Sequence, residues 1–324
     1  MKLEGFNPGG SLKDRSLLSM VEEAEKEGKI GKDSVLIDST SGNLGIALAM
    51  VGAVKGYKVT CIVDPKISAS NLQLLKSLGT KIEKVDNADS SGGYLRARIK
   101  RRNELLKETP NAWCPDQYRN PANPLAHYIS TGREILEETS GRIDFLVCAI
   151  STGGTITGCA KALKEKISNV KVIGVDAVGS AIFGDRPKKR LQIGIGSSLT
   201  VEELPNINTT LIDKVFLIGD EEAFVTARAL AREEAILAGG SSGTVTFGAL
   251  LISEELKNSA RIVAVLPDRY EHNLNECHCD AWMRDNGFPL EATSEEVWKR
   301  LDSYLKRKTQ QIHPTTGIPI IKKA

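Results

Sequence analysis

A lysine near the start of the chain lies in a setting suited to Schiff-base chemistry. Lys13 follows a turn-forming segment that contains Gly9 and Gly10, and a helical pattern begins directly after it. Glycines allow the backbone to approach a flat ring closely, and a short loop fixes the position of the amine. The chain carries 43 Lys and Arg residues, so this lysine gains weight only from the glycine-rich turns that follow it.

The second such turn spans residues 39–45 between a predicted strand and a predicted helix. Backbone amides and hydroxyls of Thr40, Ser41 and Gly42 would lie at a helix N-terminus, where the free N–H groups favour a carboxylate. Asn43 adds a neutral amide that can reach a phenolic oxygen. A serine-rich helix cap explains the same residues, and the turn alone leaves both interpretations open.

The third turn is a run of five small residues between a strand and a helix: Ser151, Thr152, Gly153, Gly154 and Thr155. Such a turn can bind a phosphate through backbone N–H and hydroxyl donors. Neither the GK[ST] ending of a P-loop nor the GxGxxG dinucleotide pattern is present. The run therefore indicates a phosphorylated cofactor that is not a nucleotide.

The fourth turn, residues 239–243, again precedes a helical pattern. Either Ser241 or Ser242 is able to face a ring nitrogen.

Two further groups of residues favour ordinary structural roles. The basic run from Arg96 to Arg102 is typical of a solvated helix face. Cys277-His278-Cys279 lacks the second ligand pair that a zinc site needs, so we predict no metal site. Three other cysteines lie in apolar patterns and are expected in the core: Cys61, Cys148 and Cys159.

Short β-rich runs alternate with helical ones from residue 35 onward. Strands are expected at 35–37, 58–63, 81–85, 145–150 and 170–176, and helices at 44–55, 70–78, 94–107, 127–138 and 157–167. Apolar strands that alternate with helices predict parallel sheets covered on both faces, the doubly wound α/β class.

Prolines at 110–124 mark the best domain boundary. We expect domains at 1–122 and 123–285, followed by a segment, 286–324, with one amphipathic helix near 297–306 and a polar tail. The irregular stretch 177–205 is long enough to cover a site.

Composition excludes several classes of function. The 324 residues are 26% charged and 41% hydrophobic with a net charge of +2, which gives no general electrostatic reason to bind nucleic acid or membranes. We recognise neither a signal peptide nor an apolar run of membrane-spanning length, so a cytoplasmic protein is expected.

The four turns, in this order and at these separations, resemble the fold-type II pyridoxal phosphate (PLP) enzymes of the cysteine synthase and cystathionine β-synthase family. Gln117-Tyr118, residues 120–124 and residues 194–196 add to the likeness, which extends from residue 4 to about 286. The resemblance implies two doubly wound domains, as in the tryptophan synthase β subunit, with PLP in the cleft between them, and a homodimer. Family members carry a further N-terminal strand that this sequence lacks.

The resemblance also implies roles for individual residues. Lys13 would bind PLP as a Schiff base, Asn43 would contact its 3′-oxygen, and Ser241 would face the ring nitrogen. Residues 151–155 would bind the phosphate, and residues 40–43 with Gln117 would bind the substrate carboxylate. A hydroxyl beside the ring nitrogen would leave the ring largely unprotonated and would favour β-elimination over transamination.

One subgroup looks nearest, the synthases of N-(2-amino-2-carboxyethyl)-L-glutamate, a precursor of 2,3-diaminopropionate for siderophores and antibiotics. The similar segments are 39–50, 63–68, 92–95, 179–185 and 266–269. Arg98, Tyr118 and Ser151 match positions that face the phosphate of O-phospho-L-serine in this subgroup. An arginine fork suits a dianionic leaving group better than an acetyl ester.

The expected function is therefore β-replacement on O-phospho-L-serine with L-glutamate, which releases phosphate through an aminoacrylate intermediate. Two alternatives stay open: a cysteine synthase that uses O-acetyl- or O-phosphoserine with sulfide, and a weakly catalytic PLP-binding regulatory protein. The basic segment 184–190 is a candidate for contacting glutamate, and an exposed basic loop explains it equally well.

Overall fold

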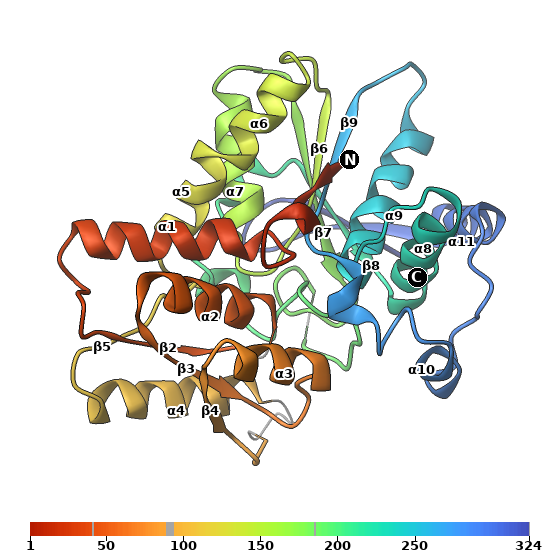
Figure 1. The fold of residues 1–324 in the computed structure, drawn as a ribbon. Coiled ribbons are helices and arrows are strands. Elements are labelled where there is room, and N and C mark those ends of the chain that lie inside the picture. The colour runs from red at the N-terminus through yellow and green to blue at the C-terminus, as the bar shows by residue number, and fades with distance from the viewer. Residues whose placement is uncertain (41, 89–93, 185, 324) are drawn as a thin grey trace. The chain divides into compact units, whose positions relative to one another are not determined.

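Two sheets organise the chain, each in its own structural unit (Figure 1). The computed structural model describes residues 1–40, 42–88, 94–184 and 186–323. Residues 7–123 form what we call the N-terminal unit, and residues 1–6 with 124–324 form the C-terminal unit. The predicted site residue Ser41, and Gly92, Gly93 and Asp185 of the resemblance segments, lie outside the described residues.

The N-terminal unit holds a parallel four-stranded sheet in the order β4-β3-β2-β5. Its strands are β2 (Val35–Ser39), β3 (Lys58–Val63), β4 (Lys81–Lys84) and β5 (Ala112–Trp113). Its helices are α1 (Lys13–Lys26), α2 (Asn43–Lys55), α3 (Ala69–Ser77) and α4 (Leu95–Glu108).

Both faces of this sheet are buried, as the doubly wound prediction requires. Leu36 and Cys61 pack with residues of α1 and α2, whereas the next residues along the same strands, Ile37 and Ile62, pack with Leu105 of α4. Successive side chains of a strand point to opposite faces, so α2 and α4 cover opposite sides. Figure 1 shows these two helices on either side of the strands.

The C-terminal unit holds seven strands in the order β1-β9-β6-β7-β8-β11-β10, parallel except for the β10–β11 pair. The strands are β1 (Lys2–Leu3), β6 (Phe145–Ala149), β7 (Lys171–Ala177), β8 (Lys214–Ile218), β9 (Ile262–Leu266), β10 (Lys308–Ile312) and β11 (Pro319–Lys323). Two mostly parallel sheets of the α/β class are thus confirmed.

Helices surround this second sheet. They are α6 (Thr131–Glu138), α7 (Gly154–Lys164), α8 (Asp220–Glu233), α9 (Gly240–Glu255), α10 (Asp280–Asp285) and α11 (Ser294–Arg307), with α5 (Ala122–Ile129) at the boundary between the units. Short 3-10 helices span Glu4–Phe6, Val201–Glu203, Thr209–Leu211 and Tyr270–Asn273. The core on one face joins Val147, Val175 and Phe216 of the strands to Val245 and Phe247 of α9.

Two expectations about single elements were wrong. The helix predicted at 127–138 is two helices, because Ser130 leaves helical geometry and its hydroxyl donates to the carbonyl of Ala126. Gly132 also packs so closely on α7 that a Cβ there would lie 2.7 Å from Cβ of Ala162. The predicted polar tail instead forms β10 and β11. Strand β11 pairs with β8 and β10 pairs with β11, which extends the sheet.

No helix within the described ranges is both long enough and apolar enough to cross a membrane.

Candidate active site

Lys13 is the first residue of α1, directly after a tight turn. The N–H of Gly10 donates to the carbonyl of Asn7 at 2.8 Å, and Gly10 adopts φ of +81°, a conformation that glycine reaches without strain. The N–H of Lys13 donates to Oγ of Ser11 at 3.2 Å. The loop thus holds the lysine backbone at a fixed position.

Asp14 closes this turn from the helix side. Its carboxylate accepts from the N–H of Gly9 at 2.5 Å, and a Cβ on Gly9 would lie 2.5 Å from the same carboxylate. A side chain at residue 9 would therefore displace the Asp14 carboxylate from this position.

The Asn43 turn follows the carboxyl end of β2. Thr40 is buried, and Asn43 begins α2 with the carbonyl of Gly42 accepting from the N–H of Gly45 at 2.9 Å. A Cβ on Gly45 would meet the Thr40 side chain at 3.1 Å, so the helix begins tight against the strand end. Anions are favoured at such a helix N-terminus.

Gln117 and Tyr118 lie in a loop that asparagine side chains hold together. Nδ2 of Asn123 donates to the carbonyl of Gln117 at 2.7 Å, and Nδ2 of Asn120 donates to the carbonyl of Pro115 at 2.9 Å. This loop follows β5, so it reaches the same sheet edge as the Asn43 turn, because the strands are parallel.

Five charged side chains gather at this edge, and we call them the charged cluster: Asp38, Asp64, Arg98, Arg102 and Asp116. Nε of Arg98 lies 3.2 Å from Oδ2 of Asp64. Nη1 of Arg102 lies 3.9 Å from Asp38 and 3.8 Å from Asp116. Asp38, Asp64 and Arg102 are each at most 6% exposed, so these charges depend on one another rather than on water.

Burial dominates the titration of this cluster. It raises the pKa of Asp38 to about 6, although the nearby Arg102 opposes that rise. Burial likewise raises the pKa of the half-buried Tyr118, and Arg98 opposes it. Tyr118 is therefore a neutral hydroxyl within electrostatic reach of Arg98.

Helix α4 corrects the interpretation of the basic run as one solvated face. Arg96 and Lys100 are exposed, but the Arg98 side chain is only 14% exposed and Arg102 is buried. Arg98 and Arg102 are four residues apart, which puts both on the helix face that packs on the sheet. The sequence analysis singled out Arg98 and missed Arg102. The four-residue spacing between them, which places both on one helix face, could have identified Arg102.

The Ser151–Thr155 turn joins β6 to α7 in the C-terminal unit. Gly153 adopts φ of +86°, and a Cβ there would lie 2.4 Å from Ile207 and 2.8 Å from the backbone of Asn206. The first amides of α7 have no partner within the helix, as at every helix start. The turn is thus a backbone cup that only glycine can form at residue 153.

Two side chains fix the rim of this cup. Oγ of Ser151 donates to the carbonyl of Gly196 at 3.3 Å, and Oγ1 of Thr155 lies 3.3 Å from Nε2 of the buried His127. Nδ1 of His127 in turn lies 2.9 Å from Oγ1 of Thr131.

Ser241 lies in the first turn of α9, buried beside a carboxylate. Its Oγ donates to Oδ1 of Asp268 at 3.3 Å, and Asp268 follows β9, the sheet neighbour of β6. The cup and Ser241 thus share the carboxyl edge of the seven-stranded sheet. The sequence analysis included residues 266–269 among the segments that resemble the synthase subgroup and predicted no role for Asp268.

The structure groups the predicted residues in two sets. Lys13, Thr40, Gly42, Asn43, Arg98, Gln117 and Tyr118 belong to the N-terminal unit, and Ser151–Thr155 and Ser241 to the C-terminal unit.

Comparison with known proteins decides the family. Residues 1–268 match the family model described as pyridoxal-phosphate-dependent enzyme. The chain belongs to this family of PLP-dependent enzymes. A hydrogen sulfide-producing enzyme from Fusobacterium nucleatum is 37% identical, with 84% of this chain and 90% of that one covered and a TM-score of 0.78. An O-acetylserine-dependent cystathionine β-synthase from Helicobacter pylori is 34% identical, with 85% and 88% covered and a TM-score of 0.79.

These matches confirm a fold-type II PLP enzyme of the cysteine synthase and cystathionine β-synthase type, which performs β-replacement. The residues present fit PLP. The cup at 151–155 supplies backbone donors where a Cβ on Gly153 would clash, and Lys13 supplies an amine at the end of a glycine turn.

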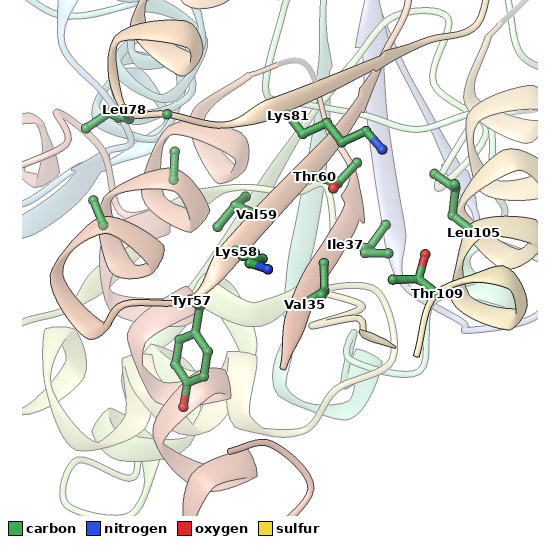
Figure 2. Close-up of a pocket in the computed structure, with 13 residues that line it drawn as sticks. Val35, Ile37, Tyr57, Lys58, Val59, Thr60, Leu78, Lys81, Leu105 and Thr109 are labelled. Carbon is green, nitrogen blue, oxygen red and sulfur yellow. The ribbon is translucent and has the colours of Figure 1, made fainter. Parts of the chain in front are cut away.

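The cavity in Figure 2 is not part of this PLP site. It measures about 470 Å³ and lies in the N-terminal unit beside Val35 and Lys58, the first residues of β2 and β3. Helix α4 contributes Leu105, and none of the predicted site residues lines it. Val35 and Lys58 are at the amino ends of their strands, whereas the Asn43 turn and the charged cluster lie at the carboxyl ends.

The Cys277–Cys279 segment has structural partners. Cys277 is buried, with its carbonyl accepting from Arg228 at 3.1 Å, and Nε2 of His278 donates to the carbonyl of Ala238 at 2.9 Å. Cys61, Cys148 and Cys159 are buried as expected. Across the described ranges, no group of three or more His, Cys, Asp or Glu side chains is arranged to hold a metal ion.

Proposed function

We propose that this PLP enzyme transfers the β-carbon unit of O-phospho-L-serine to the amine of L-glutamate, giving N-(2-amino-2-carboxyethyl)-L-glutamate and phosphate. The observation that carries the proposal is the inward position of Arg98. Its guanidinium lies beside Asp64 at the sheet edge that also holds the Asn43 turn, and its charge opposes the rise in the pKa of Tyr118. A phosphate leaving group needs such a cation, and an acetyl group does not.

Different residues of the protein have different roles in the reaction. When bound, PLP withdraws electrons from Cα of the substrate, which permits loss of the β-substituent. Lys13 binds PLP through Nζ and moves the Cα proton at the same atom. The substrate carboxylate would be bound by Thr40, Ser41, Gly42, Asn43 and Gln117. Asn43 would also contact the cofactor 3′-oxygen.

In the C-terminal unit, Ser151, Thr152, Gly153, Gly154 and Thr155 would bind the cofactor phosphate, and Ser241 would contact the ring nitrogen. The Ser151 hydroxyl also assists the substrate phosphate.

Asp64 shapes how Arg98 serves the substrate. A guanidinium has five N–H donors, so Arg98 can keep its contact with Asp64 and still donate to a phosphate. Asp64 is itself fixed, because Oδ1 accepts from the N–H of Lys66 at 2.8 Å. The ion pair thus orients Arg98 before the substrate arrives.

The assignment of L-glutamate as the nucleophile rests on the basic segment 184–190 and on the resemblance to the glutamate-using synthases. Arg186, Lys188 and Lys189 are exposed, while the preceding residues 181–183 are buried and anchor the loop. Exposed cations on an anchored loop suit an amine substrate that carries two carboxylates. In line with the same resemblance, we propose a cytoplasmic homodimer that supplies 2,3-diaminopropionate for a siderophore.

The preference of the enzyme for O-phospho-L-serine over O-acetyl-L-serine, the two serine donors, tests the proposal. Loss of charge-assisted hydrogen bonds to a phosphate costs roughly 1.5–3 kcal/mol, or about ten- to a hundredfold. We expect Arg98→Ala to lower kcat/KM for O-phospho-L-serine by this factor and to leave O-acetyl-L-serine little changed. Arg96→Ala, an exposed arginine on the same helix, is the matched control and should affect neither donor. Equal losses for both donors in Arg98→Ala would refute the role of Arg98.

A second candidate is a sulfur-dependent reaction with O-acetylserine. The relatives favour it, because one of them is described as a hydrogen sulfide-producing enzyme and the other as O-acetylserine-dependent. A preference for O-acetyl-L-serine in the wild-type enzyme would support this candidate.

A further inference from the structure

Arg102 of α4 joins two parts of the N-terminal unit. Its Nη1 lies 3.9 Å from Oδ1 of Asp38, in β2, and 3.8 Å from Oδ1 of Asp116, in the turn after β5. Its Nε and Nη2 both donate to Oδ1 of Asn103, at 3.2 and 3.1 Å, which fixes the orientation of the guanidinium. Arg102 is 6% exposed, so these contacts replace the hydration of its charge.

The Asp116 carboxylate depends on this cation. Its Oδ1 is buried and has no hydrogen-bond partner among the residues that the structure describes, so the Arg102 guanidinium is what stabilises it. The Asp116 side chain as a whole is 27% exposed. Without Arg102, its carboxylate would turn toward solvent, because a polar group that loses its partner is better hydrated than buried.

Asp116 also sets the backbone of the loop that carries Gln117 and Tyr118. It adopts φ of +44°, a left-handed conformation that residues other than glycine seldom adopt. Its carbonyl accepts from the N–H of Arg119 at 3.0 Å and from that of Asn120 at 2.9 Å. A rotation of Asp116 toward solvent would therefore displace the two site residues that follow it.

We infer that Arg102 is a positioning residue for the serine donor and acts through Asp116. The ion pair holds the loop with Gln117 and Tyr118 in place before a substrate binds. The inference rests on the proposed contact between Gln117 and the substrate carboxylate. O-phospho-L-serine and O-acetyl-L-serine carry the same α-carboxylate, so Arg102 serves both donors, whereas Arg98 is proposed to contact only the phosphate.

First-turnover kinetics of the PLP-loaded enzyme test this role. Release of phosphate or acetate is followed without a second substrate, and the donor concentration that gives half the maximal rate is measured. We expect Arg102→Met to raise this concentration roughly tenfold for both donors, the usual effect of losing one hydrogen bond to a charged group. The maximal rate and the affinity for PLP should stay near wild type, because Lys13 and the cup are untouched. A merely structural role would lower the active fraction and leave half-saturation unchanged.

Asp116→Asn shows whether Arg102 acts through Asp116. It removes the same ion pair, so alone it should match Arg102→Met, and the double variant should be no worse than either single variant. Independent effects would multiply to about a hundredfold and would overturn the inference. Arg101→Met is the matched control, because Arg101 is the next residue of α4 and its Nε lies 2.8 Å from Glu83 of β4 instead. It should leave half-saturation by both donors unchanged.

Far-UV circular dichroism checks the folding of each variant. Unchanged half-saturation in folded Arg102→Met, a change for O-phospho-L-serine alone, or an equal change in Arg101→Met overturns the inference. If Arg102→Met does not fold, Asp116→Asn decides, and unchanged half-saturation there overturns it as well. Failure of the proposed function gives a different result: a wild-type enzyme that releases acetate but no phosphate does not use O-phospho-L-serine, and the variants are then compared with O-acetyl-L-serine.

Discussion

Buried carboxyl groups distinguish this enzyme at the scale of single residues. Asp38 lies beside Arg102 and is the second-to-last residue of β2, and Asp176 is the second-to-last residue of β7. Asp176 accepts from the N–H of Ala177 at 2.8 Å and from that of Phe183 at 3.3 Å. It therefore anchors the loop that leads to the basic residues proposed to contact glutamate.

Asp176 makes stability depend on pH. Burial raises its pKa from 3.8 to about 7, against the opposing hydrogen bond from Ser180. Because the folded state holds this proton more tightly, its stabilising effect is complete below the unfolded value near 3.8 and is lost as the pH rises through about 7. The Asp176 share of the unfolding free energy should fall by roughly 4 kcal/mol over that range.

Urea unfolding of wild type and Asp176→Asn at several pH values measures this effect. The asparagine variant should have the flatter dependence, whereas Asp33→Asn, at an exposed position, should retain the wild-type slope. Parallel pH profiles for wild type and Asp176→Asn would contradict the prediction.

At the scale of single residues, the sequence motifs predicted where two helices begin. Lys13 and Asn43 begin helices after glycine turns as their motifs predict. Arg98 and Arg102 could not be separated from Arg96 and Lys100 by charge alone, because only packing of α4 on the sheet decides which cations turn inward. The hydrogen bond between Ser241 and Asp268 joins residues 27 apart in the sequence, which no local pattern records.

At the scale of elements, the glycine turns that connect strands to helices pack closely against neighbouring backbone and side chains. Gly153 combines a left-handed conformation with direct contact against the Asn206 backbone. Its replacement should therefore disturb both the cup and the packing beneath it.

Gly153→Ala tests this requirement. The conformation costs roughly 1–2 kcal/mol and the overpacking roughly 1–3 kcal/mol, so we expect clear destabilisation and strongly weakened PLP binding. Gly141→Ala is the matched control, since Gly141 has φ of +67° but nothing within 4 Å of a Cβ. It should show only the conformational cost and normal PLP binding, measured by thermal unfolding and cofactor titration. Equal effects of the two variants would mean that the close contact at Gly153 is unimportant.

Strands and helices with a strong apolar sequence pattern could be predicted, and elements whose bounds depend on tertiary contacts could not. Strands β2, β3, β6 and β7 appear within a residue or two of expectation because most of their residues are buried. The break at Ser130 depends on α7 approaching Gly132, and the polar pattern of β10 reflects an edge strand with little burial. Neither contact leaves a local signal in the sequence.

The C-terminal segment matters at the scale of the whole molecule. Strand β11 covers the edge of β8, and Tyr304 of α11 is fully buried with its hydroxyl 3.0 Å from the carbonyl of Leu217 and 2.9 Å from that of Ile321. An uncovered sheet edge exposes unpaired backbone groups and promotes aggregation. This segment is therefore part of the C-terminal unit's core.

Removal of residues 308–324 should prevent stable folding of the C-terminal unit. Tyr304→Phe, which removes only the hydroxyl, should fold and lose about 1–2 kcal/mol. Limited proteolysis and circular dichroism distinguish the two outcomes. A truncated chain that resists protease like the full chain would show that β10 and β11 are dispensable.

The most direct test of the whole account is the product of the complete reaction. The PLP-loaded enzyme is incubated with O-phospho-L-serine and equal concentrations of L-glutamate and sulfide, and products are identified by mass spectrometry. Lys13→Ala serves as the inactive control. The account predicts a secondary amine that joins the serine-derived carbon unit to glutamate, with release of phosphate. Efficient formation of cysteine with no glutamate adduct would contradict it.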